Sequence, residues 1–437
     1  PAELLALENP YDAGARDAAQ INDIHWDHAF YNGRYYVYFG IVPCLLFQLP
    51  FEALTGIQNL AYAPCMVVLG LLLLAACFGV VGQAMRRWFP QTSAAAYLLA
   101  VAAVVLGSQL YYLLVRPYIY EYAILCGAAL LMLGLWLWLS AANTPVEKRG
   151  AILAKLAFGS LFVALVAGCR PQMELFAFLA MPIFWQRYIG QKRLCSRAGA
   201  GEAAAFILPV VVVAAGLMWY NAARFGSPLD FGANYNLTGN DMTQRGFNAV
   251  RIGPAVFTSL FELPSWQGVF PFLRETDVQT NAVIRTISEK FTGGMLAATP
   301  YLWVLAMPLL PAFRRCLHRR RAVAGIVYGG IAAMVVMTVV DCEMAGVLYR
   351  YLMDYSPVLL VGAALCWFCV EGALSRRTAV GDATAAATLP ALRVVMAAAV
   401  AYTAVYRFCT LFAMEPWLQG LNPSLYYTVS RLVQFWM

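Results

Sequence analysis

The stretch MVVLGLLLLAACFGVV at residues 66–81 decides the fold of this chain. It contains no charged side chain and no alternation of polar with apolar residues. A membrane β-barrel would need such alternation in segments of about ten residues, and only helices or closed barrels satisfy the backbone in lipid. Apolar runs of about 17 to 23 residues cross the ~30 Å of hydrocarbon as helices. The chain contains many such runs, so the sequence predicts an all-α polytopic membrane protein.

The composition of the whole chain leads to the same class. Of the 437 residues, 62% are hydrophobic and 12% are charged, whereas about a quarter of the residues of a soluble domain are charged. A soluble chain of this length would split into domains and could not bury so much apolar surface. A bilayer removes that difficulty because apolar side chains then face lipid. A water-soluble fold is therefore excluded.

Ten segments are predicted to cross the membrane. Before them, polar residues 1–34 lead into the aromatic-rich stretch 35–54, which Pro43 and Pro50 interrupt, and we expect a juxtamembrane helix there. The chain begins with Pro1, and we expect a further transmembrane helix before it, which gives ten or eleven in all. The ten segments are 62–85, 92–114, 122–140, 151–168, 172–187, 204–222, 291–313, 322–340, 350–372 and 389–411.

Basic residues divide the chain into an inner and an outer side. The formal net charge is +7, and when residues 1–61 are placed outside, every basic cluster falls in an inner connection. This is the positive-inside pattern. The chain contains no recognisable RNA or DNA module, so the charge does not indicate a nucleic-acid partner. The clusters lie at 86–87, 147–149, 187–197, 314–321 and 376–377.

This topology divides the chain into four parts. They are a first extracytoplasmic loop with juxtamembrane helices (1–61), an N-terminal transmembrane module (62–222), a large extracytoplasmic loop (223–290) and a C-terminal transmembrane module (291–437). The eleven cysteines are scattered, mostly inside apolar runs, and are typical of small core residues. With only three histidines and no ligand spacing, a metal site is not predicted.

Ionisable residues gather at the predicted outer ends of the helices. Such groups are costly near the membrane interior and commonly face a wet cavity. Arginine binds phosphate oxygens in a bidentate manner and a carboxylate can act as a general base, so these residue types suit a phosphate-bearing ligand. The candidates for binding a substrate or its phosphate are Arg116, Tyr118, Glu121, Arg170, Gln172, Arg350, Tyr351 and Asp354.

Structural roles remain open for the same side chains. Arg116 can form an ion pair with Glu121 at a helix end. Arg350 is spaced for an i,i+4 pair with Asp354 on one helix. Arg170 can reach the membrane interface as a snorkelling side chain. Each of these roles would hold the fold together without contacting a ligand.

Several short motifs occur in the order found in one family of membrane enzymes. Asn32-Gly33-Arg34-Tyr35-Tyr36 is followed by Ile41-Val42-Pro43-Cys44-Leu45-Leu46 and by Leu54-Thr55-Gly56. Further along come Cys169-Arg170-Pro171, Trp219-Tyr220-Asn221-Ala222-Ala223-Arg224-Phe225-Gly226 and Arg350-Tyr351-Leu352. Together they resemble the GT-C superfamily of membrane glycosyltransferases. The likeness is to its protein-mannosyltransferase and aminoarabinose-transferase-like branch, and within it to a subgroup of large bacterial membrane proteins.

The resemblance implies a GT-C-like fold and an inverting sugar transfer. In that family a polyprenyl-phosphate sugar enters from the outer leaflet, and an aspartate of the first loop deprotonates the hydroxyl of a glycan, lipid or protein acceptor. Asp12 is then the preferred general base and Asp27 the second candidate. No cofactor is obligatory, and a divalent metal is compatible although no ligand spacing indicates one. The implied location is the bacterial inner membrane, with the active face extracytoplasmic.

Two other functions stay open. A transporter or flippase of lipid-linked glycans would show internal repeats and helices interrupted near the midplane, and the sequence shows no convincing repeat. A non-catalytic membrane scaffold would leave Asp12, Arg170 and Arg350 scattered instead of gathered around one cavity.

Overall fold

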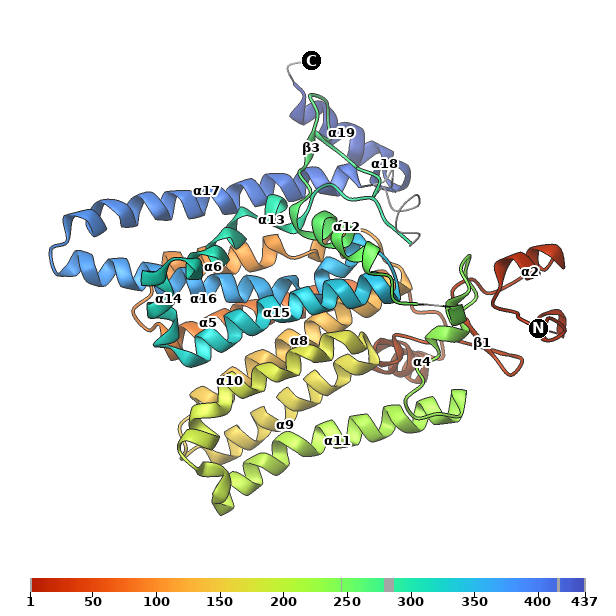
Figure 1. Ribbon diagram of the computed structural model, residues 1–437, viewed down its shortest axis with the longest axis horizontal. Helices are drawn as coiled ribbons and strands as arrows, with labels where there is room; N and C mark the ends of the chain where they lie inside the picture. The colour runs from red at the N-terminus through yellow and green to blue at the C-terminus, as the bar shows by residue number, and fades with distance from the viewer. Residues whose placement is uncertain (1, 245, 279–286, 415–416, 436–437) are drawn as a thin grey trace.

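The computed structural model describes residues 2–244, 246–278, 287–414 and 417–435, and it is 73% helical with almost no sheet. Seven of the helices in this described part are long and apolar enough to cross a membrane. They run roughly side by side along one direction (Figure 1). The seven are α5 (Tyr62–Trp88), α8 (Ile119–Asn143), α9 (Arg149–Leu165, extended by a 3₁₀ turn, Val166–Gly168), α11 (Arg197–Phe225), α15 (Arg321–Met344), α16 (Leu352–Ala379) and α17 (Ala383–Ala413).

Local sequence explains where two of these helices begin and one ends. The side chain of Ser196 accepts a hydrogen bond from the backbone N–H of Gly199 and caps α11. Asp382 accepts one from Ala385 at 3.0 Å and caps α17 in the same way. α11 stops at Gly226, whose φ of 73° lies in the left-handed region that glycine adopts without strain.

Three of the ten predicted spans are interrupted, so the expected ten or eleven long helices exceed the number in the described part of the chain. Hydropathy does not reveal the interruptions because the segments involved are largely apolar. The prediction 92–114 became α6 (Ala94–Gly107) and α7 (Leu110–Leu114), 172–187 became a 3₁₀ helix (Pro171–Leu179) and α10 (Ala180–Trp185), and 291–313 contains α13 (Met295–Ala298) and a 3₁₀ helix (Pro300–Leu309).

Proline accounts for one of these interruptions, that of the predicted span 291–313. A proline has no N–H to donate to the preceding turn, and its ring crowds the carbonyl there. Pro171 begins one of the two 3₁₀ helices, and Pro300 begins the other. Pro308 lies inside the second 3₁₀ helix, close to its end. Regular α-helix is therefore not maintained through 291–313, whereas Pro171 lies before the predicted span 172–187.

A buried arginine compensates the third interruption, which follows α6 at Ser108. The side chain of Arg407 on α17 is 1% exposed. It donates hydrogen bonds to the carbonyl oxygens of Leu106 (3.2 Å) and Gly107 (2.9 Å). Carbonyl groups at the end of a helix have no partner within it, so Arg407 supplies donors to both, and the hydroxyl of Tyr111 also donates to Leu106 (2.5 Å).

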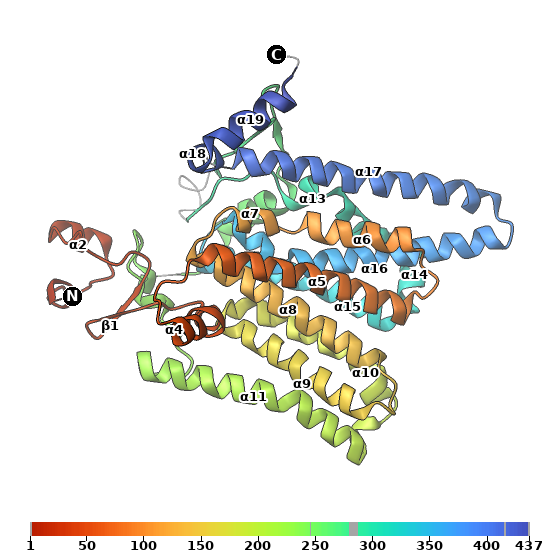
Figure 2. The same cartoon turned by 180° about the vertical axis from the view of Figure 1, so that it is seen from behind.

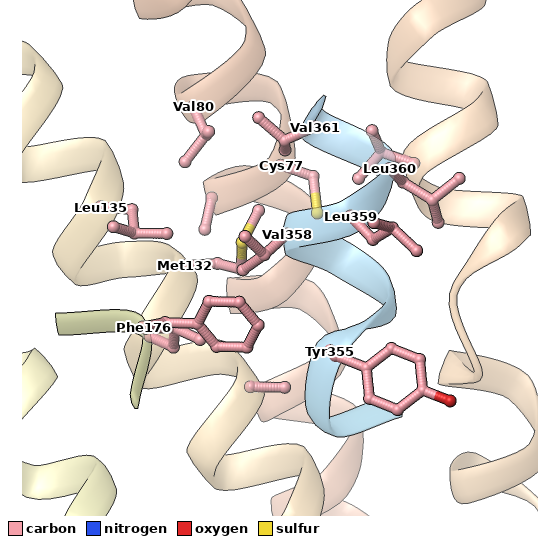
Figure 3. Close-up of a cluster of buried hydrophobic side chains, with 14 of the residues drawn as sticks. Cys77, Val80, Met132, Leu135, Phe176, Tyr355, Val358, Leu359, Leu360 and Val361 are labelled. Atoms are coloured by element: carbon pink, nitrogen blue, oxygen red, sulfur yellow. The ribbon is translucent and has the colours of Figure 1, made fainter. Parts of the chain in front are cut away.

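The hydrophobic core is built around α16. This helix packs against α5, α6, α8, α15 and α17, and every residue from Leu352 to Glu371 is buried. Figure 3 shows side chains of α5, α8 and the 3₁₀ helix that contains Phe176 meeting those of Tyr355 to Val361 on α16. Helices of the predicted N-terminal and C-terminal modules therefore share one core.

α8 and α9 approach closely at two glycines. A Cβ added to Gly134 would lie 2.5 Å from Cγ2 of Val163 and 2.8 Å from the carbonyl oxygen of Gly159. A Cβ added to Gly159 would lie 2.7 Å from Cδ1 of Trp138. Small residues allow such close contact between helices in membranes.

The first predicted loop forms several short elements. Residues 34–36, where the juxtamembrane helix was expected to begin, pair instead with 29–31 as a hairpin, and the helical stretch starts at Ile41. The elements are α1 (Ala2–Leu5), α2 (Ala13–Ala18), β1 (Ala29–Tyr31), β2 (Arg34–Tyr36), α3 (Ile41–Pro43), a π-helical turn (Cys44–Gln48) and α4 (Leu49–Thr55).

The second large loop lies beside the first at one end of the bundle (Figures 1 and 2). The backbone N–H of Asp27 donates to Leu237 (2.9 Å), and that of Leu237 donates to His28 (3.1 Å). The elements of this loop are 3₁₀ turns at Ala233–Tyr235, Met242–Gln244 and Ala249–Arg251, α12 (Ile252–Val256), a π-helical turn (Phe257–Phe261), β3 (Ser265–Trp266) and β4 (Leu273–Arg274).

Basic connections lie at the opposite end of the bundle (Figure 1). They include the turn between α16 and α17, α14 (Pro311–His318), and the π-helical turn Gln186–Gly190 with the 3₁₀ turn Arg193–Cys195. After α17 the chain returns to the end that carries the loops, where α18 (Trp417–Leu421) and α19 (Pro423–Val433) lie near β3. Acidic loops and basic turns are therefore separated by the length of the bundle.

Gly134→Val tests the close packing of α8 and α9. We expect the extra side chain to lower the free energy of unfolding by about 1–3 kcal/mol, because it cannot fit without moving backbone. Gly216→Val on α11 is the matched control, since a Cβ there meets no atom within 4 Å. Thermal unfolding in detergent compares the two, and equal stability would contradict the contact.

Candidate functional site

A cavity of about 620 Å³ lies where the two loops meet the helix ends. Its walls come from the first loop, the start of α8, the turn after α9, the end of α11, the second loop and the end of α15. Charged and aromatic side chains share these walls with apolar ones such as Leu217, Val340 and Met344. The cavity can therefore accommodate a ligand that is polar at one end and apolar at the other.

Asp27 brings a carboxylate to this cavity. Its φ of 57° is left-handed, which aspartate tolerates better than most residues, and the hydrogen bond to Leu237 fixes its backbone. The carboxylate accepts hydrogen bonds from the side-chain amide of Asn236 and, at 3.5 Å, from the hydroxyl of Tyr38. Two loops distant in sequence thus hold this side chain at the cavity wall.

The two loops are joined by further polar contacts outside the cavity wall. Arg16 is 3% exposed and donates to the carbonyl oxygens of Pro10 (2.7 Å) and Thr238 (2.5 Å). Asn9 donates to Asp241 at 2.8 Å. Burial alone would raise the pKa of Asp241, but hydrogen bonds from Thr243 and Asn9 lower it overall. The position of Asp27 therefore depends on both loops.

Arg170 forms the first charged cluster of the site. It donates to Oδ2 of Asp354 from Nη2 (2.5 Å) and Nε (3.2 Å), and Asp354 is fully buried in the first turn of α16. Asp341 of α15 lies 3.9 Å from the same guanidinium. Gln172 donates to Asp341 (3.2 Å) and Asp354 (3.4 Å). Two carboxylates therefore share one arginine in largely apolar surroundings.

Arg350 forms the second cluster. Its guanidinium pairs with Glu289 of the second loop, which also accepts its backbone N–H at 3.3 Å. Glu121, 1% exposed, lies 3.9 Å from Arg350 and 3.6 Å from Arg116. Arg116 also donates to the hydroxyl of Tyr112. Two arginines and two glutamates thus balance in charge.

The predicted site residues fall into two groups. Asp27, Arg170, Gln172, Arg350 and Tyr351 all line the cavity. The remaining residues do not line the cavity, although Asp354 lies behind Arg170 and Glu121 lies behind Arg350. The residues outside the lining are Asp12, Arg116, Tyr118, Glu121 and Asp354.

Asp12 is placed differently from the preferred general base that was expected. It is exposed and accepts the backbone N–H of Gly14 at 3.0 Å, which caps α2. Aspartate is among the best N-cap residues because its oxygen satisfies an unpaired N–H of the first turn. This local role uses the side chain outside the cavity, so Asp27 is the first-loop carboxylate that a cavity ligand would meet.

Of the two ion pairs considered as purely structural roles, the structure contains one. Arg116 and Glu121 form the ion pair considered from their spacing, at 3.6 Å. The i,i+4 pair of Arg350 with Asp354 is not found: Arg350 pairs with Glu289 and Asp354 with Arg170. Partners from other helices therefore replace the neighbour on the same helix.

Some lining residues were not among the predicted site residues. Arg224, Tyr220 and Asn221 come from the last turns of α11, and Asp341 comes from the end of α15. The only sequence signal for Arg224 was its place in the motif that ends α11. Its position in the cavity follows from the way α11 meets the first loop, where it donates to the carbonyl oxygen of Val37 at 2.8 Å.

A metal site is not evident among the residues that the structure describes. No group of three or more histidine, cysteine, aspartate or glutamate side chains within that part of the chain is arranged to hold an ion. Three arginines and two aspartates of the described residues line the cavity. Arg170 and Arg350 are paired with carboxylates, so among the described residues Arg224 is the lining arginine whose charge is left for an anionic ligand.

Comparison with known proteins adds no family to this architecture. No protein-family model matches the chain, and neither curated proteins nor solved structures give a match. The class is therefore defined by the structure itself: a helical bundle of membrane-spanning length with a polar cavity at one end.

Arg170→Gln tests the buried cluster. We expect it to lower the free energy of unfolding by about 3–5 kcal/mol, because it leaves two buried carboxylates without a cation. Adding Asp354→Asn should recover part of that loss. The free energy of unfolding in mixed micelles measures both variants.

The matched control is Arg377→Gln at the exposed pair of Arg377 with Asp382, where Arg377 is 60% exposed. An exposed pair contributes about 1 kcal/mol or less. A loss at Arg170 no larger than the loss at Arg377 would contradict the structural importance of the buried pair.

Proposed function

We propose that this protein is a membrane glycosyltransferase that moves a sugar from a polyprenyl-phosphate donor to an acceptor at the cell envelope. The observation that carries the proposal is the meeting of Asp27 with Arg170, Arg224 and Arg350 at one cavity. The reaction needs a base for the acceptor hydroxyl and cations for the phosphate that leaves. It also needs an apolar approach for the lipid chain, which Leu217 and its apolar neighbours supply.

The proposed reaction uses Asp27 as the general base. The acceptor hydroxyl transfers its proton to the Asp27 carboxylate while its oxygen bonds to the anomeric carbon of the donor sugar. The bond from that carbon to the phosphate oxygen breaks, and the lipid phosphate departs with the electron pair. Attack from the side opposite the phosphate inverts the anomeric configuration. The positive field of the arginines stabilises the charge that develops on the phosphate.

The aromatic residues of the cavity suit a sugar. Trp26 and Tyr38 flank Asp27 in the lining, and Tyr120 of α8 stacks on Phe39 at 5.3 Å between ring centroids. Aromatic faces are apolar, and tyrosine hydroxyl and tryptophan N–H groups can bond to sugar hydroxyls. These side chains would orient the sugar beside the carboxylate.

The GT-C resemblance agrees with this proposal in its ordering of elements. The motifs place an acidic loop before the first long helix, and Arg170 and Arg350 at the starts of later segments. We therefore propose a GT-C-like enzyme of the bacterial inner membrane, with the cavity on the extracytoplasmic face. No cofactor is required, and the acceptor is a glycan, lipid or protein.

Transport of a lipid-linked glycan is a second candidate function. The specific observation that favours it is the interruption of three apolar segments, after Gly107, at Pro171 and at Pro300. Transporters form substrate sites at interrupted helices. The two functions differ in product, because only the transferase releases polyprenyl phosphate.

Asp27→Asn tests the proposed base. We expect it to slow the release of polyprenyl phosphate by about 100-fold or more, because the amide cannot accept the acceptor proton. Purified protein in proteoliposomes would be supplied with a panel of polyprenyl-phosphate sugars and cell-envelope extract, and the released lipid quantified by mass spectrometry. Asp12→Asn is the control and should release lipid at the unaltered rate. Equal rates for both variants would rule out Asp27 as the base.

The proposed orientation predicts which loops are reached from outside the cell. An epitope inserted after Asn59 should bind antibody on intact spheroplasts, because the acidic loops face outward. An epitope inserted after Gly381, in the turn between α16 and α17, should bind only after permeabilisation. Antibody access in the reverse order would place the cavity on the cytoplasmic side and remove the outer-face mechanism.

A further inference from the structure

Two of the three arginines in the cavity lining are already paired with carboxylates. Nη2 of Arg170 lies 2.5 Å from Asp354, and Arg350 pairs with Glu289. A phosphate that displaced Asp354 from Arg170 would leave a fully buried carboxylate without its cation, which costs several kcal/mol. The charges of these two arginines are balanced by neighbouring carboxylates, and their hydrogen-bonding groups are largely committed.

Arg224 differs from both. Among the residues that the structure describes, no carboxylate oxygen lies within 4 Å of its guanidinium. Its two recorded hydrogen bonds go to uncharged acceptors, the carbonyl oxygen of Val37 (2.8 Å) and the side-chain oxygen of Asn221 (2.9 Å). A guanidinium has five N–H groups, so its charge and part of its donor edge remain for a ligand.

Packing holds the Arg224 guanidinium in a defined plane. It lies 3.7 Å from the ring centroid of Tyr220 and 4.6 Å from that of Phe225. Stacking of this kind favours arginine over lysine because the guanidinium is planar. A fixed planar cation loses little conformational freedom when it binds two oxygens of a phosphate.

The helix that carries Arg224 presents an apolar face to its surroundings. α11 packs mainly against α9 and lies at the margin of the bundle (Figures 1 and 2). Leu208 and Trp219 are 63% and 73% exposed. A bilayer would cover this face with lipid chains, which places Arg224 at the boundary between hydrocarbon and the polar cavity.

The apolar part of the cavity wall continues toward the same surface. Leu217 of α11 lines the cavity, as do Val340 and Met344 of α15. Val340 and Met344 are 40% and 50% exposed, so much of this apolar wall is accessible to a ligand. A lipid chain that enters the cavity would therefore meet apolar side chains from the ends of both α11 and α15.

We infer that Arg224 binds the phosphate of a membrane lipid whose chain passes between the outer ends of α11 and α15. The identity of that lipid as the sugar donor rests on the proposed function. Binding of the lipid phosphate itself does not, because it requires only the unpaired arginine and the apolar opening. Within the proposed reaction, Arg224 would be the residue that contacts the leaving phosphate directly.

Binding of decaprenyl phosphate to the full chain in detergent micelles tests this inference. We expect Arg224→Gln to weaken binding tenfold or more, which corresponds to loss of about 1.4 kcal/mol. Arg224→Lys should retain part of the affinity, because charge remains while stacking and bidentate geometry are lost. Arg34→Gln is the control, since Arg34 is exposed on the same loop that carries Asp27 and lies outside the cavity lining. Unchanged affinity in Arg224→Gln would overturn the inference.

Two further probes separate the phosphate from the lipid chain. Decaprenol, which has no phosphate, should bind without dependence on Arg224. Met344→Trp should weaken decaprenyl phosphate by narrowing the opening but leave inorganic phosphate unaffected. If inorganic phosphate binds as tightly as decaprenyl phosphate, the site takes free phosphate and the lipid assignment is wrong.

Folding and function are controlled separately. Equal melting temperatures of Arg224→Gln and the unaltered protein would show that binding is not lost through misfolding. If the melting temperature changes, partial recovery of binding in Arg224→Lys would show that the charge itself contributes to binding. Binding that depends on Arg224 without any sugar transfer would refute the transferase and keep the lipid-phosphate site. Transfer that depends on Asp27 but not on Arg224 would support the transferase and refute Arg224 as the lipid-phosphate site.

Discussion

The ion pair between Arg170 and Asp354 is the constraint on which the cavity end of the bundle depends. Asp354 is fully buried at the start of α16, the helix around which the core is packed. An unpaired carboxylate in that position would destabilise the fold by several kcal/mol, so Arg170 must remain against α16. The turn after α9 is held there with it and forms one wall of the cavity. The shape of the cavity therefore follows from the need to neutralise one buried charge, and the ligand must be accommodated around that pair.

Hydropathy predicted the class and the long helices because a run such as residues 66–81 has one stable structure in lipid. It did not predict how apolar segments are divided. Pro300 and Pro308 are visible in the sequence, but the apolar residues around them still favour a continuous span over 291–313. The interruption after Gly107 has no local signal of comparable strength, because its carbonyl groups are satisfied by Arg407 on a helix formed much later in the chain. An interruption of this kind can be predicted only when the neighbouring helix that stabilises it is known.

The residue types of the site could be predicted, but their partners could not. Positive-inside reasoning gathered the arginines and acids at one end, and Arg170 and Arg350 do line the cavity. Which acid neutralises each arginine depends on which helices become neighbours, and a single sequence does not specify that. The same limit applies to the aspartates. Asp12 and Asp27 occur in one loop. The pairing of Asp27 with Asn236, 209 positions further along the chain, and with Leu237 distinguishes the cavity residue from the helix cap.

The bond between Arg407 and the end of α6 joins residues 300 positions apart. During synthesis α6 is therefore made long before α17 can supply the donor for Gly107. Tyr111 can satisfy the carbonyl group of Leu106 locally, but until α17 arrives the carbonyl group of Gly107 needs another donor, such as water. The bundle cannot reach its final packing one helix at a time from the N-terminus. Although α17 is largely exposed along one face, it supplies the buried hydrogen bond that satisfies the end of α6.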